Sequence, residues 1–257
     1  MPEPLLKVES LTKRFGGVVP ADAISLDVPV GEFHAVIGPN GAGKTTLISL
    51  LAGEISPQGG TIYFEGSDIT GSPVHRRSAI GIARSFQISS LFADFTTLDN
   101  VALAVQAHRG HSFRFWRNAR HEKGLREPAQ AALARVGLSA RAHVRVEKLS
   151  HGERRQLEIA MALSTGPRLL LLDEPLAGMG PDESARMVSL LRQLKGSTTI
   201  LLIEHDMEAV FALADRLTVL VYGRIIASGP PETIRSDEAV RQAYLGEKNS
   251  GRSAGHA

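Results

Sequence analysis

The chain has 257 residues, 43% of them hydrophobic and 22% charged, which is the composition of a globular protein large enough to bury a sizeable core. Its formal net charge is only +2, with Lys and Arg scattered among Asp and Glu, so the charge gives no support for nucleic acid as the main ligand. There is no cysteine, which excludes disulfides, thiolate metal sites and cysteine nucleophiles. Apolar stretches of signal-peptide or membrane-spanning length are also missing, so we expect a chain that is soluble or peripheral to a membrane.

Apolar runs alternate with helical patterns along most of the chain. Near-continuous runs, typical of strands buried on both faces of a parallel sheet, occur at 33–37, 169–173 and 199–203. Helical patterns follow at 44–52, 153–164, 182–195 and 207–214. This alternation predicts an α/β layered core.

Between about 91 and 150 the texture changes to helical segments rich in Ala, Arg and His, without a convincing strand. We interpret this stretch as a helical subdomain inserted into the α/β core. Residues 246–257 are small and polar, and we expect them to form a disordered tail.

The stretch "VIGPNGAGKTTL" has the spacing of a phosphate loop, with Gly38, Gly43, Lys44 and Thr45 directly after an apolar run and before a helical pattern. Glycines let the backbone amides turn toward phosphates, Lys44 can reach the β- and γ-phosphates, and the Thr45 hydroxyl can ligate Mg2+. The alternative is a glycine-rich turn without a ligand. The strand before it and the helix after it favour the phosphate loop.

Two other predicted strands end in polar residues. "LLLLDEP" places Asp173 and Glu174 at the carboxyl end of a buried strand, where Asp173 is suited to hold Mg2+ and Glu174 to polarise a water. Taken alone, the pair could equally be exposed acids that begin a turn. "LLIEHDM" places His205 at a similar strand end, although a lone histidine is more often structural than catalytic.

The stretch "LSHGERRQLEIA" contains a capping-box pattern, in which Ser150 is followed three residues later by Glu153. The pattern predicts a helix whose N-terminal amides face outward and attract anions. An ordinary capped helix is the alternative.

Together these motifs resemble the nucleotide-binding subunits of ABC transporters. The motifs that carry the resemblance, in order, are the phosphate loop at 38–45, "SFQ" at 85–87, "LSHGE" at 149–153, "LLLLDEP" at 169–175 and "EHD" at 204–206. The resemblance covers about residues 5–240. It implies one nucleotide-binding domain over 5–242, with an α/β P-loop (RecA-like) ATPase core, an antiparallel β subdomain and the inserted α-helical subdomain at about 91–150. ATP and Mg2+ are the implied cofactors.

The resemblance also implies a role for each site residue. Phe15 stacks on adenine, and the phosphates are bound by Gly38, Pro39, Asn40, Gly41, Ala42, Gly43, Lys44, Thr45 and Thr46. The implied Mg2+ ligands are Thr45, Gln87 and Asp173. Glu174, His205 and Gln87 are the implied catalytic residues, with Gln87 sensing Mg2+ and the attacking water and His205 contacting the γ-phosphate. The signature that closes over the opposite subunit's ATP consists of Ser150, His151, Gly152 and Glu153.

The contact between the signature and the opposite subunit's ATP accounts for the second anion-binding helix end. One nucleotide needs only one phosphate loop, so the helix end at Ser150 would bind a phosphate brought by a partner subunit. The sequence departs from the family pattern at three positions. His151 and Glu153 replace the commonest glycine and glutamine, and Gly180 sits where many members have an aspartate in the loop across the dimer interface. Glu153 still completes the capping box, whereas the missing aspartate bears on the coupling between the two sites.

Four segments are most similar to the ATPases of branched-chain amino-acid importers: "LSHGERRQLEIAMAL", "DEPLAGMGP", "LLIEHDM" and "VRQAYLGE". Related importers of urea, aromatic or other amino acids are the alternatives. The resemblance implies a second ATPase subunit in a homo- or heterodimer, two transmembrane permeases, indirectly a solute-binding protein, and no nucleic acid. It places the chain peripherally on the cytoplasmic face of the inner membrane.

Two other classes fit less well. Soluble ABC-type ATPases of DNA repair or ribosomes usually carry long coiled-coil insertions or two cassettes, and a GTP-driven switch needs a guanine-reading motif. The sequence has none of these features.

A basic and aromatic segment lies within the predicted helical subdomain, where Arg114, Trp116, Arg117 and Arg120 are close in sequence. It reads either as a solvated basic face or as a surface that docks on a membrane or permease. We also predict that Phe92 and the stretch after Gln87 line the groove that receives a permease helix.

Overall fold

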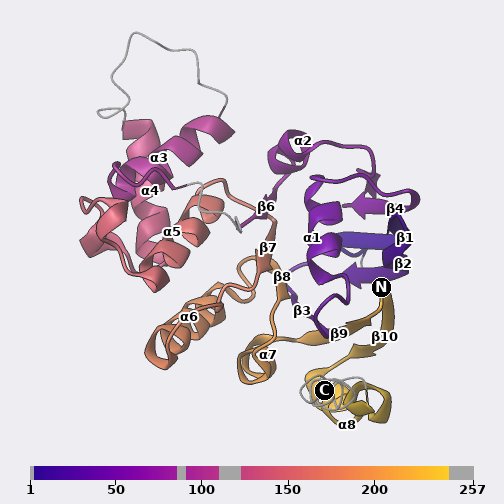
Figure 1. Cartoon of the computed structure of the whole chain (residues 1–257). Coiled ribbons are helices and arrows are strands. Elements are labelled where there is room, and N and C mark those ends of the chain that lie inside the picture. The colour runs from indigo at the N-terminus through magenta and orange to yellow at the C-terminus, as the bar shows by residue number, and fades with distance from the viewer. Residues whose placement is uncertain (1–2, 86–90, 110–122, 243–257) are drawn as a thin grey trace, which may run out of the picture. The chain divides into compact units, whose positions relative to one another are not determined.

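The computed structural model describes residues 3–85, 91–109 and 123–242, and the chain divides into two compact units (Figure 1). The first unit comprises residues 1–74 and 195–257, and the second comprises residues 75–194.

The first unit contains an antiparallel sheet of four strands in the order β2, β1, β4, β5. Their bounds are β1 (Leu6–Phe15), β2 (Val18–Val28), β4 (Gly59–Phe64) and β5 (Ser67–Asp68). Leu6 lies opposite both Val28 and Phe64, and all three side chains are buried. Lys7, which follows Leu6, is exposed, because successive side chains of a strand point to opposite faces.

A second set of four neighbouring strands in this unit has the order β10, β9, β3, β8. They are β3 (Phe33–Ile37), β8 (Thr199–Ile203), β9 (Arg216–Val221) and β10 (Arg224–Gly229). β3 is parallel to both β8 and β9, and β10 is antiparallel to β9. Every residue of β3 and β8 is buried, which explains why their sequences are apolar or β-branched apart from His34.

The helices with defined bounds in the described part of the first unit are α1 (Lys44–Ala52), α7 (Met207–Leu213) and α8 (Pro231–Ser236). α1 follows β3 and α7 follows β8, so in both cases a helix begins shortly after the carboxyl end of a buried parallel strand. This is the usual place for ligand-binding groups in α/β proteins.

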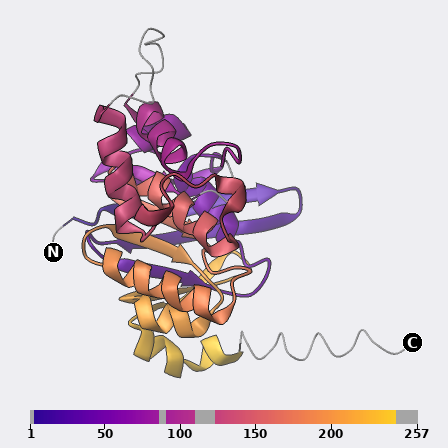
Figure 2. The ribbon, with the colours of Figure 1, turned by 90° about the vertical axis from the view of Figure 1, so that its left-hand side faces the viewer.

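The second unit contains the parallel pair β6 (Ile82–Arg84) and β7 (Leu169–Asp173). Its helices are α3 (Thr97–His108), α4 (Lys123–Arg135), α5 (His151–Leu163) and α6 (Pro181–Leu194), with short 3-10 turns η2 (Ser139–Arg141) and η3 (Val146–Lys148). α2 (Val74–Ala79) begins at the boundary between the units. α3, α4 and α5 pack against one another as a group, which Figure 2 shows in magenta to pink.

The predicted core elements are confirmed. The strands expected at 33–37, 169–173 and 199–203 have those bounds, and the helix expected at 44–52 is α1. α5, α6 and α7 differ from their predicted bounds by one or two residues at an end. In the described parts of 91–150 the secondary structure is helical, but the division into a domain at 5–242 with a subdomain at about 91–150 stays a prediction.

Several predictions fall outside the described residues: the disordered tail at 246–257, the basic and aromatic segment around Trp116, and the roles given to Gln87 and to the residues directly after it. Within the described ranges, the helices are all too short or too polar to cross a bilayer.

Candidate functional site

The phosphate-loop sequence forms the turn between β3 and α1. Gly43 is the N-cap residue of α1 and has a left-handed backbone, with φ 106°. A Cβ added there would collide with the carbonyl oxygen of Pro20, and one added at Gly38 would collide with that of Leu220. Only glycine therefore fits this path of the backbone, and Gly43 has no side chain to cap the first turn of α1. The amides at this helix end point toward a place suited to an anion.

Lys44 begins α1, and the residue is only 7% exposed. Its Nζ donates hydrogen bonds to the carbonyl oxygens of Gly38 at 2.7 Å and Pro39 at 2.9 Å. The Lys44 ammonium is thus held over the loop that precedes α1. An ammonium has three donors, so it can keep part of this bonding while it contacts a phosphate.

Thr45 and Phe15 are two exposed members of the predicted nucleotide site in the first unit. The Thr45 side chain is exposed on the first turn of α1. Phe15 ends β1 with 50% of its surface exposed, and Lys13 Nζ lies 5.2 Å from its ring centroid. An aromatic face of this kind is available for stacking on a planar ring.

His205 follows β8 and is held through its backbone. The amide of His205 donates to Glu204 Oε2 at 2.9 Å, and the Glu204 carboxylate is completely buried. Asp206 caps α7, because its Oδ1 accepts from the amides of Glu208 at 3.0 Å and Ala209 at 3.1 Å. The imidazole between these two anchored residues is exposed by 64%, with Nδ1 3.7 Å from Glu204 Oε2.

Asp173 and Glu174 lie in the second unit, at the carboxyl end of β7. Asp173 is 2% exposed, and its Oδ2 accepts a hydrogen bond from a terminal nitrogen of Arg84 at 3.0 Å. Glu174 is half-buried and has φ 46°, a left-handed backbone that is costly for a residue with a Cβ. Carboxylates of this kind are the hard oxygen ligands and proton acceptors that nucleotide hydrolysis uses.

The capping box predicted at Ser150 is present at the N-terminus of α5. Ser150 Oγ accepts from the Glu153 amide at 3.2 Å, and Glu153 Oε2 accepts from the Ser150 amide at 2.9 Å. Arg141 also donates to Glu153, with its Nε 2.6 Å from Oε1. The hydrogen bond from Arg141 is the main cause that lowers the pKa of Glu153 below its ordinary value. Glu153 therefore stays ionised and keeps the helix end fixed.

The comparisons with known proteins decide the family. The family described as ABC transporter matches residues 21–177, and the family described as branched-chain amino acid ATP-binding cassette transporter matches residues 224–248. This chain belongs to the ABC transporter ATP-binding family.

Relatives and solved structures agree with this membership. The high-affinity branched-chain amino acid transport ATP-binding proteins BraF of Pseudomonas aeruginosa and LivG of Escherichia coli K12 are each 38% identical to this cassette, over 96% of its length and 100% of theirs. The ADP conformation of a solved ABC transporter cassette is 31% identical, with a TM-score of 0.84 over 95% of this chain and 99% of that one. The fold is thus that of an ABC ATPase, and members of this family are ATPases coupled to transport.

The structure brings some of the predicted site residues of this cassette together, each set within one unit. Gly38, Gly43, Lys44 and Thr45 form one loop and helix start, and Ser150, Gly152 and Glu153 form another. Gln87 lies outside the described residues, so its predicted role is untested. Phe92 is described, is 54% exposed, and lies 5.4 Å from Phe95 between ring centroids.

The departures from the family pattern also have definite places. His151 Nε2 lies 3.1 Å from the carbonyl oxygen of Ala177, so the residue that replaces a glycine contacts the loop after β7. Gly180 is exposed directly before α6.

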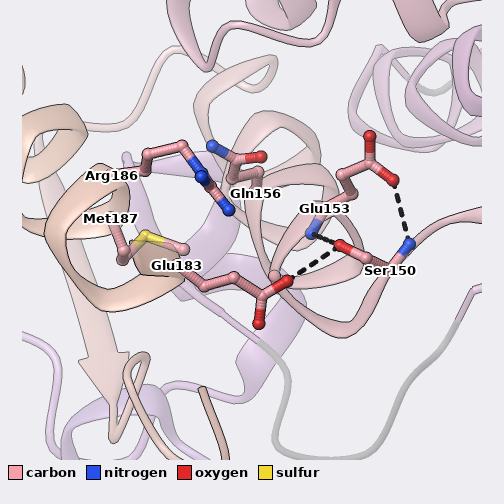
Figure 3. Close-up of a pocket in the computed structure, with 7 residues that line it drawn as sticks. Ser150, Glu153, Gln156, Glu183, Arg186 and Met187 are labelled. Carbon is pink, nitrogen blue, oxygen red and sulfur yellow. Dashed lines mark hydrogen bonds between the residues drawn. The ribbon is translucent and has the colours of Figure 1, made fainter. Parts of the chain in front are cut away.

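Two contacts of the cassette were missed in the sequence. Arg84, which pairs with Asp173, comes from a strand of three residues with no periodic signal. Glu183, in the first turn of α6, accepts a hydrogen bond from Ser150 Oγ at 3.0 Å (Figure 3). An acidic residue two positions after Pro181 looks like an ordinary first-turn helix acid, so no signal in the sequence distinguishes it.

Proposed function

We propose that this chain is the ATP-hydrolysing subunit of an importer for branched-chain amino acids. The observation that carries the proposal is the 38% identity to BraF and LivG over the full length of both relatives. The separate match at 224–248 supports the same substrate class.

In this proposal the phosphate loop of the first unit binds the phosphates of ATP. The backbone amides between Gly38 and Thr46 surround them, except at Pro39, which has no N–H. Lys44 contacts the β- and γ-phosphates by exchanging part of its bonding to the loop carbonyls. Phe15 stacks on adenine, an assignment supported by its half-exposed ring at a strand end.

The residues assigned to Mg2+ suit it by chemistry. Thr45 offers an exposed hydroxyl, Gln87 a carboxamide and Asp173 a carboxylate, and Mg2+ prefers a few oxygen ligands together with substrate phosphates. When bound, the ion neutralises charge on the β- and γ-phosphates. Arg84 would orient the Asp173 carboxylate for this task through its hydrogen bond to Oδ2.

Hydrolysis then depends on Glu174 and His205. Glu174 accepts a proton from the water that attacks the γ-phosphorus, while the bond from that phosphorus to the β,γ-bridging oxygen breaks. The products are ADP and inorganic phosphate. His205 contacts the γ-phosphate, a role supported by its exposed ring between two anchored neighbours.

The working unit is a dimer of ATPase subunits, in which the signature residues Ser150 and Gly152 of one subunit close on the γ-phosphate held by the other. The capping box at the start of α5 supports this assignment, because the N-terminus of a helix attracts anions. The dimer would act on two permeases at the cytoplasmic face of the inner membrane, with a solute-binding protein on the other side.

Affinity purification of the chain from its native membranes tests the importer assignment. We expect two permeases, a second ATPase or a second copy of this chain, and a solute-binding protein whose thermal unfolding midpoint rises with leucine, isoleucine or valine. Stabilisation by urea or aromatic amino acids alone would transfer the chain to a related importer. Recovery of only ribosomal or DNA-repair proteins would overturn the transport assignment.

A Glu174→Gln variant tests the chemistry independently. It should bind ATP and dimerise while its turnover falls by at least about 100-fold, the usual contribution of a general base. Unchanged turnover would remove Glu174 from that role.

A further inference from the structure

The carboxylate of Glu183 lies against the N-terminus of the signature helix α5. Ser150 Oγ donates a hydrogen bond to Glu183 Oε1 at 3.0 Å. The carboxylate also packs on Gly152, where an added Cβ would lie 2.9 Å from the same oxygen. Figure 3 shows Glu183 pointing from α6 toward Ser150, in a small pocket that Arg186 also lines.

The position of Glu183 is electrostatically favourable for an anion. The residue belongs to the first turn of α6 and faces the first turn of α5. Both helix ends carry partial positive charge, which stabilises a carboxylate near them. A phosphate oxygen would be stabilised at the N-terminus of α5 for the same reason. The Glu183 carboxylate therefore occupies a position that also suits a phosphate, because both are anions.

The Ser150 hydroxyl cannot serve Glu183 and a phosphate at once. Its oxygen accepts from the Glu153 amide at 3.2 Å, and its single proton is donated to Glu183. A phosphate oxygen needs that same proton. In addition, the negative charges of a carboxylate and a phosphate in contact repel each other.

We propose that Glu183 holds the phosphate-binding end of α5 in the separate subunit, and that the γ-phosphate of the opposite subunit displaces it when the ATP dimer closes. This inference rests on the proposed function, from which it takes the pairing of the signature with ATP. Glu183 is then a positioning residue for Ser150 that makes closure depend on a triphosphate, because ADP has no γ-phosphate to compete with it. After its release, Glu183 can pair with Arg186, one turn further along α6.

The test is the ATP concentration at which half of the protein dimerises, measured by analytical ultracentrifugation in the Glu174→Gln background. Adding Glu183→Gln should lower this concentration about three- to tenfold, because a neutral acceptor binds the serine proton more weakly than a carboxylate and does not repel phosphate. Glu183→Ala should lower it at least as far. ADP affinity of the monomers should be the same in all variants, because the phosphate loop lies elsewhere in the chain.

Asp182→Asn is the matched control, since it removes a carboxylate from the same helical turn at an exposed position. Thermal unfolding midpoints check that each variant is folded, and the near-isosteric Glu183→Gln keeps the test valid if the alanine variant is unstable. If the Glu183 and Asp182 variants dimerised at the same half-maximal ATP concentration, or if Glu183→Gln needed more ATP than the parent, this inference alone would be overturned. Failure of the Glu174→Gln parent to dimerise with ATP, both with itself and with the co-purified second ATPase, would overturn the ATP-dependent pairing in the proposed function, and this inference with it.

Discussion

Arg84 and Asp173 form a buried ion pair at the ends of two neighbouring strands. A terminal nitrogen of Arg84 lies 3.0 Å from Asp173 Oδ2, and the two side chains are 9% and 1% exposed. β6 and β7 are parallel, with Arg84 opposite Leu171, so the arginine reaches the carboxylate from the adjacent strand. The pair therefore fixes the side chain to which Mg2+ binding is assigned.

Replacing Arg84 with methionine should destabilise the protein strongly. The change leaves the Asp173 carboxylate buried without this cation, which typically lowers the free energy of unfolding by about 3–5 kcal/mol. Denaturant unfolding measures the loss. Adding Asp173→Asn to the same chain should recover part of it, because the buried charge is then removed.

Arg145→Met is the control for this prediction. Arg145 is 61% exposed and lies 3.7 Å from the Glu147 carboxylate, so its ion pair is screened by solvent and its replacement should change stability little. If Arg84→Met lowered the free energy of unfolding no more than this control does, the buried ion pair would not contribute more to stability than an exposed one.

Gly43→Ala should abolish nucleotide binding. The backbone at Gly43 has φ 106°, and a Cβ would collide with the Pro20 carbonyl, so the loop must move away from its present path. The loss of unfolding free energy should exceed the about 1–2 kcal/mol that a left-handed backbone costs a residue with a Cβ. Unfolding curves and the binding of a fluorescent ADP analogue measure the two effects.

Gly196→Ala is the control that separates the strain of a left-handed backbone from the collision of an added Cβ. Gly196 has φ 80° and open space where a Cβ would be added. Its replacement should lower the free energy of unfolding only by the cost of the left-handed backbone and should leave nucleotide binding intact. Normal ADP binding by Gly43→Ala would contradict the role assigned to the shape of this loop.

Much of the fold could be predicted because burial leaves a simple pattern. β3, β7 and β8 are buried on both faces, and their apolar runs in the sequence have the same bounds as the strands. The start of α1 and the capping box at Ser150 were also predictable, because glycine spacing and a Ser to Glu interval act within a few residues.

The contacts between distant residues could not be predicted in this way. Glu183 meets Ser150 across 33 positions, and Arg84 meets Asp173 across 89. Both contacts depend on how separate elements pack, which periodicity within one element does not encode. The left-handed backbone of Glu174 is likewise invisible in the sequence, since glutamate normally avoids that conformation.

The capping carboxylate of Glu153 predicts a definite pH dependence of stability. Arg141 lowers the pKa of Glu153 in the folded state, so this group stabilises the fold above its unfolded pKa of about 4.3 and loses that contribution as the pH falls through the lower folded value. Glu153→Gln should therefore be less stable than the wild type at pH 7, by about 0.5–1.5 kcal/mol, and the difference should disappear toward pH 3.

Urea unfolding of both proteins from pH 3 to pH 7 measures this difference. Glu127→Gln, at an exposed position of α4, controls for the removal of one carboxylate. A difference between Glu153→Gln and wild type that stayed constant over this range would contradict a role for the ionised carboxylate.

The cap at Asp206 should control the position of His205. Asp206→Ala removes the acceptor for the Glu208 and Ala209 amides, which should lower the free energy of unfolding by about 1 kcal/mol and loosen the turn that carries the imidazole. We expect kcat for ATP hydrolysis to fall severalfold with KM nearly unchanged, because the phosphate loop is untouched. Asp206→Ser restores a side-chain cap without the charge, so it should recover most of both losses. If the serine variant were as slow as the alanine variant, the carboxylate charge of Asp206, and not its capping hydrogen bonds, would be the property that matters.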